Sequence, residues 1–204
     1  RKKIIYQNWN LLPTRIHYML LFVGLGNPTP DSENNRHNVG FKIIDSINKK
    51  FSLSKQKPKF KGLLTTGNVA DQKIYAIKPL TFMNNSGICI RELIEYFKID
   101  AEDVIVFHDD LDVEFGKIKA KFGGSSAGHN GIASIDKFIG KDYSRVRVGI
   151  GKPKDNIEIS DYVLQNFDDD EMTGLEKITN DITDSISILV DKKLDLFSST
   201  VNNK

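Results

Sequence analysis

Four histidines are the first candidates for chemistry in this sequence: His17, His37, His108 and His129. His37 stands out because it lies between Arg36 and Asn38, in a polar stretch that separates a predicted strand from a predicted helix. Imidazole exchanges its proton near neutral pH, so His37 is a candidate general base. No serine lies in a nucleophile-elbow pattern, and Cys89 falls inside a predicted amphipathic helix. General-base activation of water is therefore the simplest hydrolytic chemistry that these residues support.

An acidic cluster at 108–112 follows the predicted strand 104–107 and holds three carboxylates, at Asp109, Asp110 and Asp112. Carboxylates in such a group can bind a divalent cation. Consecutive strand residues point to opposite faces, however, so Asp109 and Asp110 cannot easily share one ion. Ordinary turn acidity and a carboxylate that orients a histidine are the alternatives.

Two glycine-rich segments, 24–28 and 123–131, are also candidate sites. The first resembles a dinucleotide fingerprint but has Thr29 where the third glycine belongs, and Pro28 disfavours a helical start. We interpret its glycines as allowing a tight turn that lets Asn27 face a cleft. In the second segment, His129 beside Asn130 is suited equally to bonding a substrate or the loop backbone.

Alternating strand and helix patterns must position these residues. Apolar or alternating segments predict strands at 20–23, 74–77, 104–107, 117–122 and 145–150. Helical spacing predicts helices at 39–51, after a capping Ser86 to Phe97, around 132–139, and as one long helix at 172–189. This alternation predicts a single α/β domain, whose twisted sheet has helices on both faces. Ligands of such sheets bind beyond the carboxyl ends of the strands, where Asn27, Asn84 and Asp109 fall.

Charge is distributed unevenly along the chain. Residues 117–154 hold nine Lys or Arg against two acids, whereas residues 155–204 hold twelve acids against four lysines. We expect the strands at 117–122 and 145–150 to present basic side chains outward. A polyanion would favour such a face because each phosphate contact releases counterions. A merely solvated charged face is the alternative.

The chain contains no run of about 18 apolar residues, which argues against a membrane-spanning helix. Its single cysteine excludes an internal disulfide and predicts a reducing, cytoplasmic setting. Residues 1–19 are basic and lack acids, so they form a predicted extension before a domain at 20–204. An organellar targeting remnant, upstream sequence before a start at Met19, and an added segment all remain open.

Five motifs occur in order between about residues 20 and 167: 24–28 with 36–38, 78–84, 108–112, 123–131 and 147–151. Together they resemble the bacterial-type peptidyl-tRNA hydrolase family. The resemblance implies a single domain with a mixed twisted sheet and no metal or other cofactor. It implies that the substrate is peptidyl-tRNA, and that the ester joining the peptide to the 3′ end of tRNA is cut.

The resemblance also implies roles for individual residues. His37 would deprotonate water, Asp109 would orient His37, and Asn84 would donate to the oxyanion. The substrate would be held by residues of three motifs: Asn27, Met83, Gly128, His129 and Asn130. Phosphates of tRNA would meet the basic strands at Lys119, Lys121, Arg145 and Arg147.

Two positions depart from the family pattern. Ser32 stands where the family usually has an aromatic residue near the cleft, and Ser125-Ser126-Ala127 replaces a more glycine-rich run. Both changes bear on substrate affinity rather than on the proposed base. The competing hypothesis is a non-catalytic RNA-binding module on the same fold that acts in organellar RNA processing. We expect a monomer with no membrane partner.

Overall fold

The computed structural model describes residues 19–153 and 157–204. Its centre is a seven-stranded sheet with the order β2-β3-β4-β1-β5-β7-β6. The strands are β1 Leu20–Gly24, β2 Lys57–Lys59, β3 Gly62–Val69, β4 Gln72–Pro79, β5 Val104–Asp110, β6 Ile118–Phe122 and β7 Ser144–Gly149. The four central strands, β4, β1, β5 and β7, run parallel, whereas β2, β3 and β6 pair antiparallel. The predicted mixed sheet is therefore confirmed.

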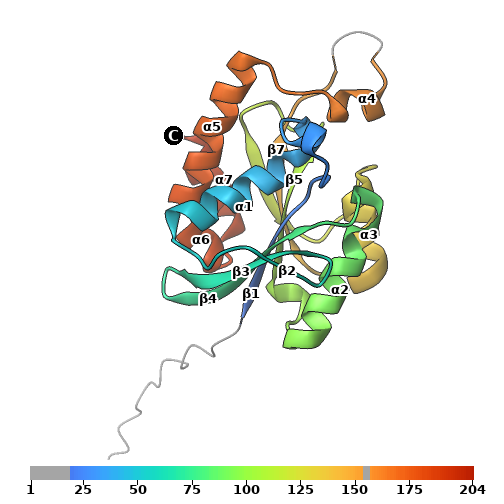
Figure 1. Ribbon diagram of the computed structural model, residues 1–204. Coiled ribbons are helices and arrows are strands. Elements are labelled where there is room, and N and C mark those ends of the chain that lie inside the picture. Colours follow the sequence, from blue (N-terminus) through green and yellow to red (C-terminus); the bar gives the residue numbers. More distant parts are fainter. Residues whose placement is uncertain (1–18, 154–156) are drawn as a thin grey trace, which may run out of the picture.

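Helices cover both faces of this sheet (Figure 1). On one face lie α1 (Val39–Lys50), α5 (Asp169–Asp184), α6 (Ile186–Val190) and α7 (Leu194–Asn202). On the other lie α2 (Ser86–Phe97) and α3 (Asn130–Ile139). Each face has its own apolar cluster, with Phe22 and Phe107 in the first and Val23 and Val106 in the second. Consecutive residues of the buried central strands thus support opposite layers.

Several element predictions were wrong in detail. The hairpin of β2 and β3 was missed because its segment has many lysines and no regular apolar alternation. Strand β4 does not stop at Lys78 but includes it, and Lys78 is buried with its ammonium on Asp45. Ser86 is the first residue of α2 rather than its cap, and its hydroxyl donates to the Met83 carbonyl.

The predicted long helix at 172–189 is two helices, because α5 ends at Asp184, α6 begins at Ile186, and Ser185 between them caps both. A short helix, α4 (Ile159–Leu164), was not predicted at all. Among the described residues, no helix is long and apolar enough to cross a bilayer.

The glycines of β1 and α1 allow close packing rather than the tight turn that we expected. A Cβ at Gly24 would lie 2.3 Å from the Gly40 carbonyl oxygen, and one at Gly40 would lie 2.4 Å from the Leu25 nitrogen. Strand and helix therefore touch backbone to backbone at this point. This contact brings the start of α1, and the residues before it, against the end of the central strands.

Candidate active site

His37 and Asp109 meet at the carboxyl end of the central strands. His37 belongs to the 3-10 turn η2 (Arg36–Asn38) that leads into α1, and Asp109 is the penultimate residue of β5. The Nδ1 atom of His37 lies 2.8 Å from Oδ1 of Asp109, and both side chains are buried. The backbone packing of α1 on β1 thus places the imidazole beside a carboxylate that lies 72 residues away in the sequence.

Opposing effects act on the protons of this pair. Burial alone lowers the pKa of His37, but the charge of Asp109 and its hydrogen bond outweigh burial and raise that pKa above its usual value. Burial disfavours the Asp109 carboxylate, yet the charges of His37 and His129 and their hydrogen bonds bring its pKa well below the usual range. Asp109 is therefore ionised, and it holds the Nδ1 proton of His37, leaving Nε2 to accept another proton.

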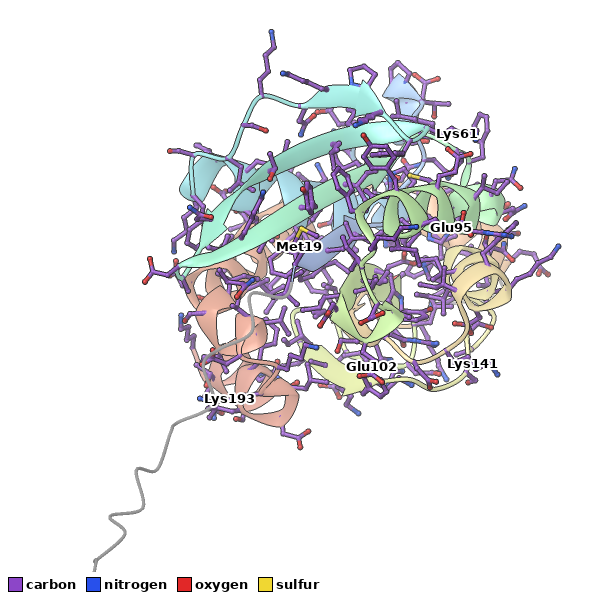
Figure 2. All side chains as sticks on the ribbon, turned by 90° about the horizontal axis from the view of Figure 1, so that it is seen from below. Met19, Lys61, Glu95, Glu102, Lys141 and Lys193 are labelled. Atoms are coloured by element: carbon purple, nitrogen blue, oxygen red, sulfur yellow. The ribbon has the colours of Figure 1, made fainter. Side chains whose placement is uncertain are left out.

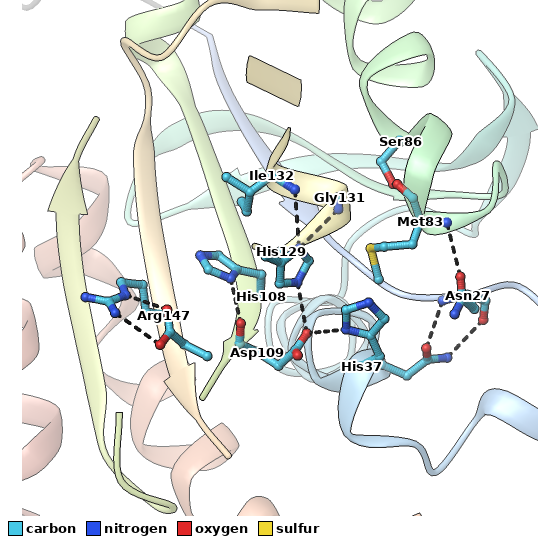
Figure 3. Close-up of polar contacts among 12 residues, drawn as sticks. Asn27, His37, Met83, Ser86, His108, Asp109, His129, Gly131, Ile132 and Arg147 are labelled. Atoms are coloured by element: carbon cyan, nitrogen blue, oxygen red, sulfur yellow. Dashed lines mark hydrogen bonds and ion pairs between the residues drawn. The ribbon is translucent and has the colours of Figure 1, made fainter. Parts of the chain in front are cut away.

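His129 is the second partner of Asp109, and this contact was not predicted from sequence. Its Nε2 lies 3.0 Å from the same Oδ1 atom. Figure 3 marks this contact with a dashed line between His129 and Asp109. Its Nδ1 accepts from the backbone N–H groups of Gly131 and Ile132, so His129 is the N-cap of α3. Because Nδ1 accepts two donors, the ring proton must reside on Nε2 and point at Asp109.

Three ligand atoms of His37, Asp109 and His129 lie within 4.8 Å of one another, close enough for a metal ion. The hydrogen bonding fits a different use. Both imidazoles turn N–H groups toward one carboxylate oxygen, and a metal would need the Nε2 lone pair of His129 while its Nδ1 faces two N–H donors. These residues are therefore arranged as donors around an anion rather than as a ligand set.

His108 is the third imidazole of this cluster, and it is packed edge-on against His129 with ring centroids 4.9 Å apart. Burial, and then the neighbouring His129, lower the pKa of His108 to about 3. Its Nδ1 lies 2.7 Å from the backbone oxygen of Asp109. His108 is therefore neutral, and it serves as packing behind the site.

A cavity of about 640 Å³ opens beside this cluster. His37, Asp109 and the loop 126–130 form one side, including the predicted substrate residues Gly128, His129 and Asn130. The rest of the lining mixes the apolar side chains Leu111, Pro153, Ile159 and Val163 with the polar Asp110, Asp112, Lys152 and Ser160. Helix α4 thus supplies a wall of the cavity that sequence reasoning missed.

Asn27 lies on the other side of His37, in a network that η2 organises. Its backbone N–H donates to Oδ1 of Asn38, and the Asn38 amide donates to the Asn27 carbonyl. Its own Oδ1 accepts from the N–H of Met83 at 3.1 Å. This bond ties the β1 end to the turn η3 (Met83–Asn85), where Asn84 is exposed.

Met83 joins η3 to the start of α3. It is buried, and a Cβ at Gly131 would lie 2.5 Å from its sulfur, so the Met83 side chain packs closely on the start of α3 and would have to shift if Gly131 were larger. This contact and the Asn27 bond link residues of three motifs, but Asn27 lines a separate cavity, and neither Met83 nor Asn84 is among the residues that line the cavity of about 640 Å³.

Comparisons with known proteins agree with this geometry. The model of a family described as peptidyl-tRNA hydrolase matches residues 21–204. A peptidyl-tRNA hydrolase of Pelagibacter ubique is 82% identical over 186 residues, which cover 91% of this chain and all of the relative. One from Ehrlichia canis is 41% identical, covering 90% of this chain and 94% of the relative.

The chain belongs to the peptidyl-tRNA hydrolase family. A solved peptidyl-tRNA hydrolase from Acinetobacter baumannii superposes with a TM-score of 0.84 at 31% identity, covering 90% of this chain and 94% of that one. Membership supports the hydrolase hypothesis over the non-catalytic RNA-binding module. These bacterial relatives lend no support to an organellar compartment. The N-terminal division stays a prediction, because residues 1–18 lie outside the described residues.

The basic residues assigned to tRNA contact prove to be of two kinds. Lys119 and Lys121 extend from β6, with Lys119 exposed and Lys121 half-buried. Arg145 is only 1% exposed, and its guanidinium bonds Asp136 and the Ser125 carbonyl. The expected outward presentation of Arg145 is therefore wrong. Helix α3 and the loop before it supply these two partners, so they cover the side of β7 on which Arg145 lies.

The exposure of Arg147 is intermediate between that of Lys119 and that of the buried Arg145. Its guanidinium makes two bonds to Asp110, at 2.6 and 3.0 Å, and its side chain is 17% exposed. Asp110 therefore orients Arg147 at the cavity side of β7. The bidentate geometry leaves part of the guanidinium open to solvent.

Both departures from the family pattern lie near the site. Ser32 is buried, and its hydroxyl lies 2.7 Å from that of Thr29, so it turns away from solvent. In the loop, Ala127 has a positive φ of 48°, a conformation that favours glycine. The family's glycines would relieve strain at this position. Cys89 is buried, which raises its pKa to about 12 and agrees with packing.

Proposed function

We propose that this chain hydrolyses the ester between a peptide, or an N-blocked amino acid, and the 3′ end of tRNA, with His37 as general base. The observation that supports this most is the 2.8 Å bond from Nδ1 of His37 to Asp109 at the wall of the cavity. It leaves Nε2 to receive a proton from water, as base catalysis requires.

In the proposed reaction, the oxygen of water attacks the ester carbonyl carbon while Nε2 of His37 takes its proton. The tetrahedral intermediate then expels the ribose oxygen, which takes that proton back from His37. Asp109 stabilises the imidazolium between the two steps. The proton acquired from water thus leaves on the tRNA, and the hydroxyl remains on the peptide as its carboxyl group.

Asn84 is proposed to donate its amide to the oxygen that becomes negative. It lies in η3, which packs on α3, and its side chain makes no bond within the described residues that would compete. One such donor is typically worth about 3 to 4 kcal/mol in the transition state. Asn27 and Asn130, on either side of η3, would hold the peptide and the terminal nucleotide.

Lys119 and Lys121 are proposed to meet phosphates of the acceptor arm, with Arg147 nearer the cavity. Strands β6 and β7 pair Lys119 with Arg147 in register, so these cations form one row. A monomeric state and a cytoplasmic location remain expectations.

The test is turnover of a short peptidyl-tRNA by the wild type and by a His37→Ala variant. We expect turnover without added metal, no effect of a chelator, and loss of about 10² to 10⁴ in rate in the variant. Equal activity in the variant would refute the assignment of the base. Tight tRNA binding without turnover by the wild type would instead favour a binding module.

A further inference from the structure

The sheet edge opposite β6 carries a second concentration of positive charge. Between residues 46 and 70 the chain has six lysines and no acid: Lys49, Lys50, Lys55, Lys57, Lys59 and Lys61. The last four belong to the β2–β3 hairpin and the segment before it, which we call the hairpin surface. Lys61 lies on the opposite side of the molecule from Lys193, which follows α6 near β6 (Figure 2).

Most of this charge is not neutralised. Lys55, Lys57 and Lys59 are exposed. Within residues 19–153 and 157–204, neither Lys55 nor Lys57 takes part in an ion pair, whereas Lys61 binds Glu92 of α2. Lysine and proline on an edge strand discourage sheet-to-sheet aggregation, which accounts for Lys57 and Pro58. It does not account for Lys55, which lies before the strand, and the nearby acid Asp45 is bound by Lys78 and Gln56 instead.

Aromatic rings lie directly beside these lysines. The ammonium of Lys59 lies 4.5 Å from the centroid of the Tyr96 ring and 4.8 Å from that of Phe60. Tyr96 is 62% exposed, although its ring packs against Phe60 and Phe97. Fixed cations beside an exposed ring are the features that proteins use to bind the backbone and bases of RNA.

We propose that the hairpin surface binds RNA, and that it is a second RNA-binding surface, separate from the one at Lys119 and Lys121. The seven-stranded order puts six strand spacings between β2 and β6, or about 29 Å at roughly 4.8 Å each. The two surfaces are therefore too far apart to contact the same phosphate. An RNA partner fits better than an acidic protein, because the exposed ring of Tyr96 can stack on a base, whereas an acidic side chain would use only the cations.

The experiment uses the full chain and a labelled RNA hairpin that has no single-stranded 3′ end. The labelled hairpin should bind a Lys119→Ala/Lys121→Ala variant about as tightly as it binds the wild type, because that variant leaves the hairpin surface intact. A Lys55→Gln/Lys57→Gln variant should bind it on the order of tenfold more weakly, with a salt slope lower by roughly two. The matched control is Lys177→Gln/Lys204→Gln, which removes the same charge from the acidic tail and should change neither quantity.

Three results would overturn the proposal. They are loss of hairpin binding in the Lys119/Lys121 variant, wild-type binding by the Lys55/Lys57 variant, and an equal loss in the control. Loss of binding to an acidic polypeptide, with RNA binding unchanged, would assign the surface to a protein partner. Turnover of peptidyl-tRNA by the variant should equal that of the wild type, so failure here is distinguishable from failure of the proposed hydrolysis.

Discussion

The end of β5 carries two consecutive aspartates whose surroundings differ. Asp109 faces His37 and His129, whose hydrogen bonds converge on its Oδ1 atom. Asp110 faces the other side and binds the permanently charged guanidinium of Arg147. The same chemical group thus accepts exchangeable protons at Asp109, on one face of the strand, and binds a permanent cation at Asp110, on the other face. The partner, rather than the acid, decides which side can perform proton transfer.

Substitution of each aspartate by asparagine is the strongest test of this difference. Asp109→Asn should lower kcat/KM by about 10² to 10⁴, because the amide no longer stabilises an imidazolium and can select the wrong tautomer. Asp110→Asn should leave kcat near the wild-type value. Steady-state rates on peptidyl-tRNA measure both, and a comparable loss of kcat in Asp110→Asn would erase the distinction.

The pH dependence of the rate gives a second test of the difference between Asp109 and Asp110. Because the pKa of His37 is raised, kcat/KM should fall about tenfold for each pH unit below that raised value. Asp109→Asn should move the inflection to lower pH, whereas Asp110→Asn should not move it. An inflection that stays in place in Asp109→Asn would contradict the pairing.

The raised pKa of His37 also has a consequence for stability. Protonated His37 stabilises the fold fully below its unfolded pKa, and this contribution is lost as pH rises through the folded pKa. Chemical denaturation across this window should therefore show a decrease in the free energy of unfolding that His37→Gln lacks. A pH-independent difference between the two proteins would argue against the raised pKa.

Two substitutions of His129 separate its two roles, which are to cap α3 and to donate a hydrogen bond to Asp109. His129→Asn keeps an oxygen that can cap α3, whereas His129→Leu removes the cap, at a cost of about 1 kcal/mol. Both variants lose the imidazole Nε2–H that donates to Asp109, because the asparagine amide is shorter than the ring when its oxygen caps α3, so both should lower kcat. Thermal unfolding should distinguish them, and equal melting temperatures would refute the capping role.

The smallest expected effect concerns the two lysines of β6, which lie next to the strand that carries Arg147. Lys119→Ala/Lys121→Ala should reduce the salt slope of tRNA binding by roughly two, with kcat at saturating substrate unchanged. Lys137→Ala/Lys141→Ala removes the same charge from exposed positions in and after α3 and is the control. An unchanged slope in the first variant would mean that β6 faces another partner.

Sequence patterns predicted the central strands and the polar residues at their ends because those strands are short, apolar runs. They did not reveal the β2–β3 hairpin or helix α4, whose charged residues show no regular apolar spacing. The alternation rule correctly separated Asp109 from Asp110. The same rule failed for Arg145, because alternation specifies which side of a strand a residue faces and not what covers that side.

The kinds of chemistry available could be predicted from the sequence alone: an imidazole in a polar turn, an acidic strand end, and motifs that belong together in one family. That Asp109 binds two imidazoles, that His129 caps α3 and that Arg145 is buried became visible only in the folded chain. These outcomes depend on contacts between residues far apart in the chain. Such contacts follow from the close packing of α1 on β1 and of η3 on α3, which no local pattern records.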